Sequence, residues 1–146
     1  MQIRKDIVLE GSSSITANVL VDTGASMTLL PKSVADRIGV KYTGEQVSMS
    51  GAFAGMGDMA DVAVVSIRFP FLNNLLYVTR VAVSTKANDI LLGLDILNPL
   101  KMTIDTHTHE IVVKNEVIEV AKAGLMVAGG IAITALILKA LFDGDQ

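Results

Sequence analysis

The sequence predicts a mostly-β, single-lobe domain followed by a hydrophobic C-terminal helix. The chain has 146 residues, which is the length of one domain with a real core. Short aliphatic and β-branched runs, separated by Gly, Asn, Ser and Pro, fill residues 1–120. Residues 121–146 lack this pattern and contain a long apolar run. We therefore expect a β domain over 1–120 and a separate segment over 121–146.

The first half of the β domain is predicted to contain two paired strands and one helix. Ile3–Leu9 and Ile15–Val21 have strand composition, and the turn residues Gly11–Ser14 lie between them, as in a hairpin. A short helix is expected over Val34–Ile38, and Gly39 is placed to end it.

The second half is predicted to add further strands. They are Val62–Phe69 and Leu75–Val83 around an Asn73-Asn74 turn, the apolar run Ile90–Leu97, a hairpin of Met102–Asp105 with Glu110–Val113, and a last strand Val117–Val120.

Residues 123–142, AGLMVAGGIAITALILKALF, are apolar around a whole helix and include one charge, Lys139. About twenty helical residues span roughly 30 Å, the thickness of a bilayer core. We expect a membrane-spanning anchor, and Lys114 and Lys122 before it favour a cytoplasmic β domain. The alternative is a helix buried against the domain or in a soluble oligomer.

Composition excludes several classes of function. The net charge is −3 with no dense Lys/Arg block, so a nucleic-acid partner is not expected. The absence of cysteine excludes disulfides, thiolate metal sites and a cysteine nucleophile. His107-x-His109 offers only two imidazoles, so we expect a solvated turn rather than a metal site.

The stretch VLVDTGAS, Val19–Ser26, places an acid directly after an apolar strand. A lone buried carboxylate costs several kcal/mol or loses its charge, so it needs a partner or an exposed position. In the simplest interpretation the motif is a strand-ending turn in which the acid caps and Gly24 adopts a positive φ. About seventy residues later comes ILLGLDIL, Ile90–Leu97, and a glycine-rich apolar stretch, Val47–Met59, lies between the two.

Together with TLLPKSVADRIGV and MTIDTHTHEIVV, these motifs make Ile3 to Val113 resemble the retropepsins, the single-lobe aspartic proteases of retroviruses and retrotransposons. The similarity is greatest to their cellular and prokaryotic single-domain relatives. It implies a closed, barrel-like acid-protease fold with one short helix. It also implies an aspartic endopeptidase that hydrolyses polypeptides without a metal or other cofactor. The alternative is a catalytically weak retropepsin-like scaffold for binding or assembly.

In this resemblance Asp22 is the catalytic acid. Retropepsin-type sites need two Asp-Thr-Gly loops, and this chain has one. The only other Asp-Thr, Asp105-Thr106, is followed by His107 and is expected to be structural. The second carboxylate must then come from a second copy, which predicts a homodimer with its site on the twofold axis.

The resemblance gives roles to the neighbours of Asp22. Thr23 holds the opposite loop through a hydrogen bond, and Gly24 lets backbone approach the carboxylates and donates an amide. Ala25 stands where pepsin-type enzymes often carry a hydroxyl, so a less acidic pH optimum is expected. Ser26 borders the cleft; the alternative is a solvent-facing turn serine.

The glycine-rich stretch is expected to form a flap over the substrate. Its candidate residues are Phe53, Ala54, Gly55, Met56 and Gly57. Glycine suits a flap tip because backbone amides must approach the substrate closely. Leu20, Ile90 and flap residues are expected to line apolar pockets; an ordinary surface loop is the alternative.

Two residues of ILLGLDIL are expected to support the site. Gly93 is expected to let a strand cross beneath the active-site loop. Asp95 is expected to cap a short helix from Ile96 rather than act as a second catalytic acid.

Overall fold

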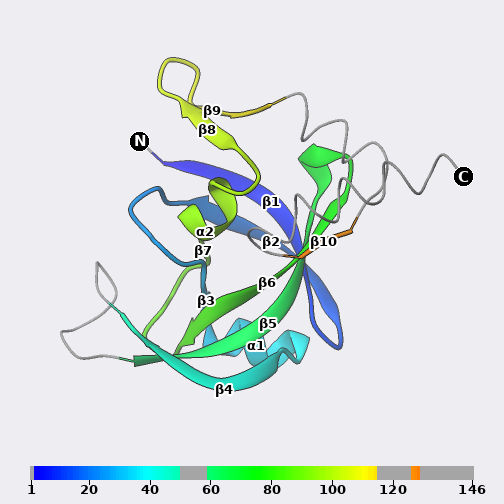
Figure 1. Ribbon diagram of the computed structural model, residues 1–146, viewed down its shortest axis with the longest axis vertical. Coiled ribbons are helices and arrows are strands. Elements are labelled where there is room, and N and C mark those ends of the chain that lie inside the picture. The colour runs from blue at the N-terminus through cyan, green and yellow to red at the C-terminus, as the bar shows by residue number, and fades with distance from the viewer. Residues whose placement is uncertain (1, 50–58, 115–125, 129–146) are drawn as a thin grey trace, which may run out of the picture.

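The computed structural model describes residues 2–49, 59–114 and 126–128, and these form a mostly-β fold with short helices (Figure 1). The strands are β1 Ile3–Glu10, β2 Ser14–Val21, β3 Leu29–Pro31, β4 Lys41–Ser48, β5 Met59–Phe69, β6 Leu75–Ser84, β7 Leu91–Leu92, β8 Met102–Asp105, β9 Glu110–Val113 and β10 Met126–Ala128. The helices are α1 Lys32–Ile38, α2 Leu94–Leu97 and the 3₁₀ turn η1 Pro70–Leu72.

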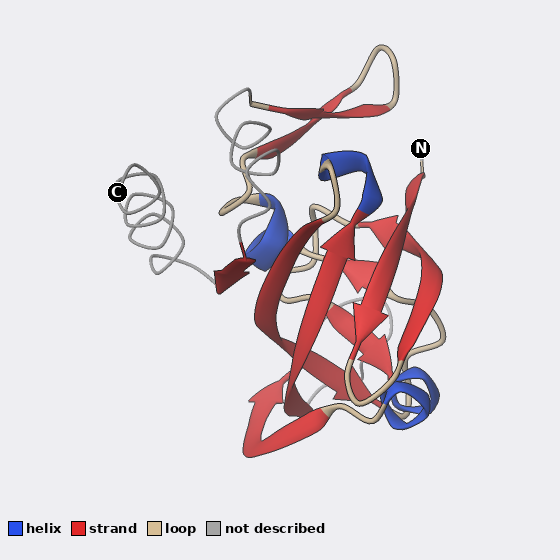
Figure 2. Ribbon diagram, turned by 90° about the vertical axis from the view of Figure 1, so that its right-hand side faces the viewer, coloured by secondary structure: helices blue, strands red, loops and turns tan. Residues whose placement is uncertain are grey.

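The strand pairings close on themselves, which gives the barrel-like body expected from the sequence. The order of strands in the sheet is β10-β6-β3-β7-β2-β1-β5-β4. An additional pairing between β5 and β6 closes the strands from β6 to β5 in this order into a ring. β1 and β2 pair antiparallel along their whole length, from Ile3 opposite Val21 to Glu10 opposite Ser14. By contrast, β7 is parallel to β2, and β3 is parallel to β6. Figure 2 shows α1 at one end of the strands and the other short helices toward the opposite end.

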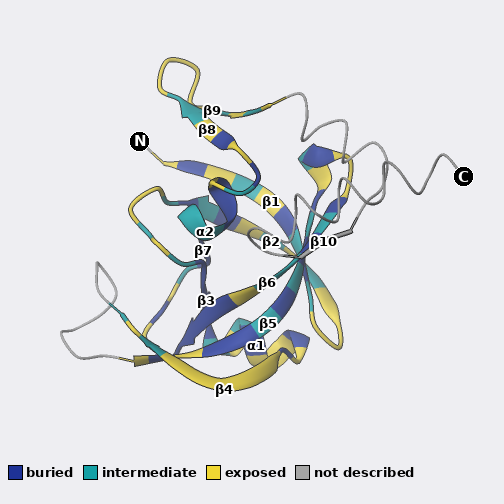
Figure 3. Ribbon diagram, in the orientation of Figure 1, coloured by how far each residue is buried: buried dark blue, intermediate teal, exposed yellow. Residues whose placement is uncertain are grey.

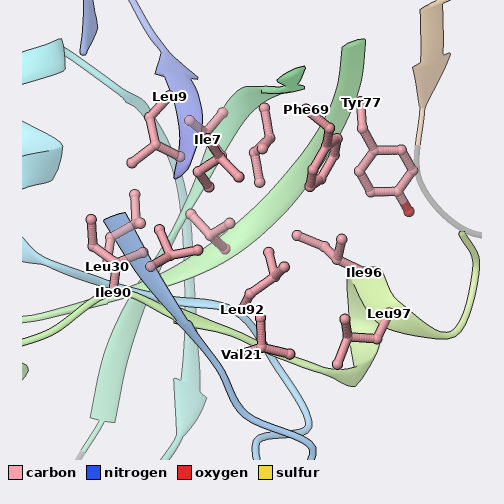
Figure 4. Close-up of a cluster of buried hydrophobic side chains, with 14 of the residues drawn as sticks. Ile7, Leu9, Val21, Leu30, Phe69, Tyr77, Ile90, Leu92, Ile96 and Leu97 are labelled. Atoms are coloured by element: carbon pink, nitrogen blue, oxygen red, sulfur yellow. The ribbon is translucent and has the colours of Figure 1, made fainter. Parts of the chain in front are cut away.

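Buried residues are spread over the strands of this ring (Figure 3), and their side chains form one hydrophobic cluster. Ile7 and Leu9 from β1 belong to the same cluster as Phe69 and Tyr77 from β5 and β6, and all four are almost completely buried (Figure 4). Each buried Leu, Ile or Phe side chain stabilises the fold by about 1.5–3 kcal/mol relative to an exposed one. Packing in this core therefore fixes the positions of the strands, including β2, whose end leads into the candidate site.

Local pattern predicted most elements correctly. The hairpin Met102–Asp105 with Glu110–Val113 has the predicted bounds, and it projects from the barrel in both views (Figures 1 and 2). Helix α1 ends at Gly39, whose φ of 67° is left-handed and whose amide bonds back to Ala35 O. The predicted strand Val117–Val120 lies outside the described residues.

Strand β4 is the main element that sequence analysis missed. Its side chains are exposed except for Val47, so no alternating pattern of apolar residues marks it. Among the described strands it pairs with β5, and the register shifts between Tyr42 and Gln46, around Gly44 with a φ of 86°. A bulged, charged strand at a sheet edge resists pairing with other chains.

The C-terminal segment differs from the expected continuous helix at the three residues that are described. Met126–Ala128 is extended and pairs in parallel with Leu76–Val78 of β6. This edge of β6 is free there because β3 pairs only with Ala82–Ser84, so an added strand satisfies its backbone groups. The rest of the predicted span 123–142 lies outside the described residues. Within the described part of the chain, no helix is long and apolar enough to cross a membrane.

Candidate active site

Asp22 lies directly after β2, at the point where β2 runs beside β7. The Asp22 amide donates to Leu92 O at 3.0 Å, and the Leu20 amide donates to Ile90 O at 2.9 Å. These bonds continue the parallel pairing of Leu20 with Leu91 and Val21 with Leu92. The VLVDTG and ILLGLD motifs, distant in sequence, are therefore adjacent in the barrel.

The Asp22 carboxylate is half-buried and is held by its own turn. The Gly24 amide donates to Asp22 Oδ1 at 2.8 Å, and the Ala25 amide donates to Asp22 O at 3.2 Å. A β-carbon added at Gly24 would lie 3.1 Å from Asp22 Oδ1, so glycine permits this close approach. The turn thus orients the acid at the end of β2 and leaves it partly exposed.

The neighbouring residues differ in exposure. Thr23 and Ser26 are exposed, and Ala25 is half-buried. The carbonyl of Ala25 accepts the Leu94 amide at 2.8 Å, which ties the loop to the start of α2. Within one copy of the chain, the side chains of Thr23 and Ser26 are therefore available for contacts with a partner or substrate.

Gly93 makes the contact between the loop and α2 possible. A β-carbon there would lie 2.8 Å from Ala25 O and 2.9 Å from the carbonyl carbon of Met27. Both are backbone atoms, so no side-chain rotation relieves such a clash. The backbone of Gly93 is extended, and close approach rather than φ therefore calls for glycine.

Asp95 does not have the capping position expected for it. Helix α2 begins at Leu94, with Gly93 as its N-cap residue, so Asp95 is inside the first turn. Its Oδ1 instead accepts two hydrogen bonds from Thr28, at 2.9 Å from the amide and 2.8 Å from Oγ1. The difference arises because a partner 67 residues away in the chain offers two donors.

Thr28 is the supporting residue that sequence analysis missed. Its side chain is completely buried, and its Oγ1 both donates to Asp95 and accepts the Gly93 amide at 3.0 Å. Its carbonyl accepts the Ala82 amide at 2.9 Å. Thr28 therefore connects the Asp22 loop to α2 and β6. The sequence shows a threonine in an apolar run just after the loop, but nothing near it indicates that Asp95 and Gly93 are its partners.

Burial raises the pKa of Asp95, and the hydrogen bonds from Thr28 oppose that rise. The folded protein therefore holds this proton to higher pH than the unfolded chain, and the contribution of Asp95 to stability falls as pH rises from about 4 through its folded pKa. Asp95→Asn keeps an acceptor oxygen but does not titrate. We expect the free energy of unfolding of Asp95→Asn, relative to wild type, to rise across this window and then level off. Urea unfolding at pH 4 to 7 measures this difference, and a constant or falling one contradicts the expectation.

A second apolar cluster lies beside Asp22, separate from the main core. We call it the floor cluster; its buried members are Leu29, Ala60, Ala82, Ala87 and Leu91, and the partly buried Leu20, Met27, Val47 and Met49 pack against them. Leu20 was expected at this site. Ile90 was expected with it but belongs to the main core (Figure 4), because alternation along the strand turns Leu91 to the other face.

The predicted flap residues Phe53, Ala54, Gly55, Met56 and Gly57 lie outside the described residues. The strands on either side, β4 and β5, are described and pair from Lys41 opposite Val64 to Ser48 opposite Met59. Val47 and Met49 from this hairpin pack against the floor cluster. The paired strands β4 and β5 therefore flank residues 50–58, and Val47 and Met49, just before these residues, contact the floor cluster.

The other candidate groups lie in the exposed β8–β9 turn. Asp105 Oδ1 accepts the amides of His107 and Thr108 at 2.8 and 3.2 Å, as a structural turn acid does. His107 and His109 are both exposed. Among the residues with described positions, no three His, Cys, Asp or Glu side chains are grouped as metal ligands would be.

A closed barrel that presents an Asp-Thr-Gly turn beside a buried Leu-Leu-Gly strand defines an acid-protease-like fold. Residues 12–99, more than half of the chain, match the family described as "gag-polyprotein putative aspartyl protease". The chain belongs to this family. No curated protein matches it in sequence.

The first of three similar solved structures supports the same fold. The EIAV protease, solved with the inhibitor HBY-793, has a TM-score of 0.51 and 24% identity, and the match covers 72% of this chain and 93% of that one. The retroviral protease-like domain of Ddi1 from Leishmania major has a TM-score of 0.49 and 16% identity, over 77% and 89% of the two chains. A retropepsin-like aspartic protease from Rickettsia conorii has a TM-score of 0.47 and 21% identity, over 70% and 76%.

Proposed function

We propose that this chain is an aspartic endopeptidase that acts as a homodimer, with one Asp22 from each subunit at a shared site. The observation that carries the proposal is the position of Asp22, half-buried at the end of β2 and held by the Gly24 amide at 2.8 Å. Membership of the aspartyl protease family supports the same chemistry. The sequence contains one Asp-Thr-Gly, so the second acid comes from another copy.

Two carboxylates in this arrangement share one proton. At about 4 Å and an effective dielectric near 20, two negative charges repel by about 4 kcal/mol. Ionising both carboxylates at once is therefore costly, and one proton shared between them relieves this repulsion. The ionised member accepts a proton from a water molecule, whose oxygen attacks the peptide carbonyl. The protonated member stabilises the oxyanion. The leaving nitrogen then receives a proton from the pair of carboxylates, which is left with one proton again.

The surroundings of Asp22 suit an extended polypeptide substrate. The floor cluster offers apolar contacts through Leu20, Met27 and Val47. An extended peptide pairs its main chain with edges of the site and places alternate side chains against such surfaces. The apolar floor favours aliphatic or aromatic side chains next to the scissile bond.

The proposal is tested by incubating the chain with a peptide library and mapping products by mass spectrometry, with and without hydroxylamine and EDTA. Direct attack by water gives only free carboxyl termini, insensitive to EDTA. Hydroxamate products would instead reveal an acyl-enzyme, and loss of cleavage in EDTA would reveal a metal. Peptide binding without any cleavage would contradict the proposal and favour the scaffold alternative.

A further inference from the structure

A polar cluster lies on the same face of the barrel as Asp22. Arg4 of β1 is directly opposite Leu20 of β2, and opposed residues of paired strands point to the same face. Leu20 is two residues before Asp22, and the Asp22 amide still continues the pairing of β2 with β7 through its bond to Leu92 O, so the two residues share a face. From strand spacing, the Cα of Arg4 lies roughly 8 Å from that of Asp22. Arg4 is therefore within reach of a peptide bound at Asp22.

The guanidinium of Arg4 crosses β2 to an acid on the far side. Its two terminal nitrogens bind the two carboxylate oxygens of Asp89, Nη1 to Oδ1 at 3.4 Å and Nη2 to Oδ2. Asp89 is the residue before Ile90, whose amide donates to Asp89 Oδ1 at 2.8 Å. The ion pair thus spans β2, the strand that precedes Asp22, beside Leu20, which packs against the floor cluster.

Further contacts extend this cluster along β1 and β2. Arg4 Nη1 also donates to Asn18 Oδ1 at 3.4 Å, and Asn18 Nδ2 donates to Asp6 Oδ1 at 2.9 Å. We call Arg4, Asp6, Asn18 and Asp89 the polar rim. Lys5, between Arg4 and Asp6 in sequence, points to the other face and lies over the ring of Phe71. Two carboxylates therefore accompany one guanidinium, and the rim carries a net negative charge.

The rim remains accessible to a ligand. The side chains of Arg4 and Asp89 are 38% and 25% exposed. A carboxylate offers about four acceptor positions, and the described contacts of Asp6 use one of them. A cationic side chain can bind such acceptors, whereas an anionic one meets net repulsion.

We propose that the polar rim selects a lysine or arginine side chain two or three residues from the scissile bond, an inference that rests on the proposed endopeptidase function. The position follows from the separation of roughly 8 Å, because an extended peptide advances about 3.3 Å per residue. The substrate class is then a polypeptide with apolar residues at the cleaved bond and a basic residue flanking them.

The test uses peptides that differ only in having Lys, Gln or Glu at the second or third residue on either side of the cleaved bond. For wild type we expect kcat/KM to fall in that order at one of these positions, with a Lys-to-Glu ratio of about five at low salt. Asp89→Asn leaves Arg4 without its carboxylate, so the ratio should fall to one or below. Glu10→Gln is the matched control: Glu10 is also on β1 and pairs with Arg68 at 3.2 Å, six residues along from Arg4. It should leave the ratio unchanged.

The outcomes separate this inference from the proposed function. Cleavage that is equal for Lys, Gln and Glu peptides, or a ratio that Asp89→Asn does not change, overturns the selection of a basic side chain and leaves the endopeptidase in place. No cleavage of any peptide by wild type overturns the endopeptidase and the inference with it.

Discussion

Asp22→Asn is expected to abolish peptide hydrolysis while leaving the fold intact. The amide oxygen of asparagine can still accept the Gly24 amide, so the turn after β2 keeps its bond of 2.8 Å. Asparagine cannot take a proton from water, and two such side chains cannot share one. Loss of this acid–base function should lower kcat by about 10³-fold or more. Peptide cleavage assays, with circular dichroism and thermal melting of the same preparations, measure both parts of the prediction.

The chain supplies a matched control in its other Asp-Thr dipeptide. Asp105→Asn makes the same chemical change in the exposed β8–β9 turn, where the carboxylate accepts the amides of His107 and Thr108. This variant should retain wild-type kcat. Equal activity of Asp22→Asn and Asp105→Asn would remove Asp22 from the chemistry.

Gly93→Ala is expected to give the second large effect, on both stability and activity. The added methyl group would lie 2.8 Å from Ala25 O and 2.9 Å from the carbonyl carbon of Met27, so the loop after Asp22 must move. Overpacking of this kind costs about 1–3 kcal/mol of stability. The shift also weakens the bond from the Leu94 amide to Ala25 O and misplaces Asp22. A displacement of about 1 Å near reacting groups lowers activity by about a hundredfold.

Urea unfolding and kcat/KM measure these two effects separately. Gly44→Ala is a useful comparison, because an added β-carbon there meets no atom within 4 Å, although its φ of 86° is strained for alanine. Gly44→Ala should lower stability through backbone strain, but it should not lower kcat/KM as Gly93→Ala does. If Gly93→Ala had both the activity and the stability of wild type, close packing between the Asp22 loop and α2 would not be needed for the site.

The sequence predicts those parts of the fold that depend on local pattern. Alternation identified β1 and β2, Gly39 marked the end of α1, and polar turn residues fixed the bounds of the β8–β9 hairpin. Each of these signals acts over a few neighbouring residues, where side-chain periodicity and φ preference are decisive.

Long-range pairing set the features that sequence analysis missed. The bond between Thr28 and Asp95 joins residues 67 apart, and nothing near either residue indicates its partner. Similarly, β7 is only two residues long, and its parallel pairing with β2 decides that Leu91 faces the floor cluster and Leu92 the core. Strand β4 has almost no buried side chain, so its backbone pairing with β5 defines it.

The sequence predicts the catalytic acid of the candidate site better than it predicts the residues that hold that acid in place. Asp22 and the turn glycine, Gly24, follow from the Asp-Thr-Gly motif after an apolar strand. Thr28 and the polar rim follow only once the register of β1, β2 and β7 is known. Residues 50–58, where the flap is expected, lie outside the described part of the chain, and that expectation stays a prediction.

The central claim is that Asp22 works with its own copy in a second chain, and subunit mixing tests this most directly. Wild-type protein is refolded with a ninefold excess of Asp22→Asn, and hydrolysis of saturating peptide is measured per wild-type chain. Random pairing leaves about one tenth of wild-type chains in intact dimers, so activity should fall to about one tenth. The same excess of an inert protein should have no effect. Activity that stays at the wild-type level in the mixture would show that each chain works alone, and would contradict the shared site.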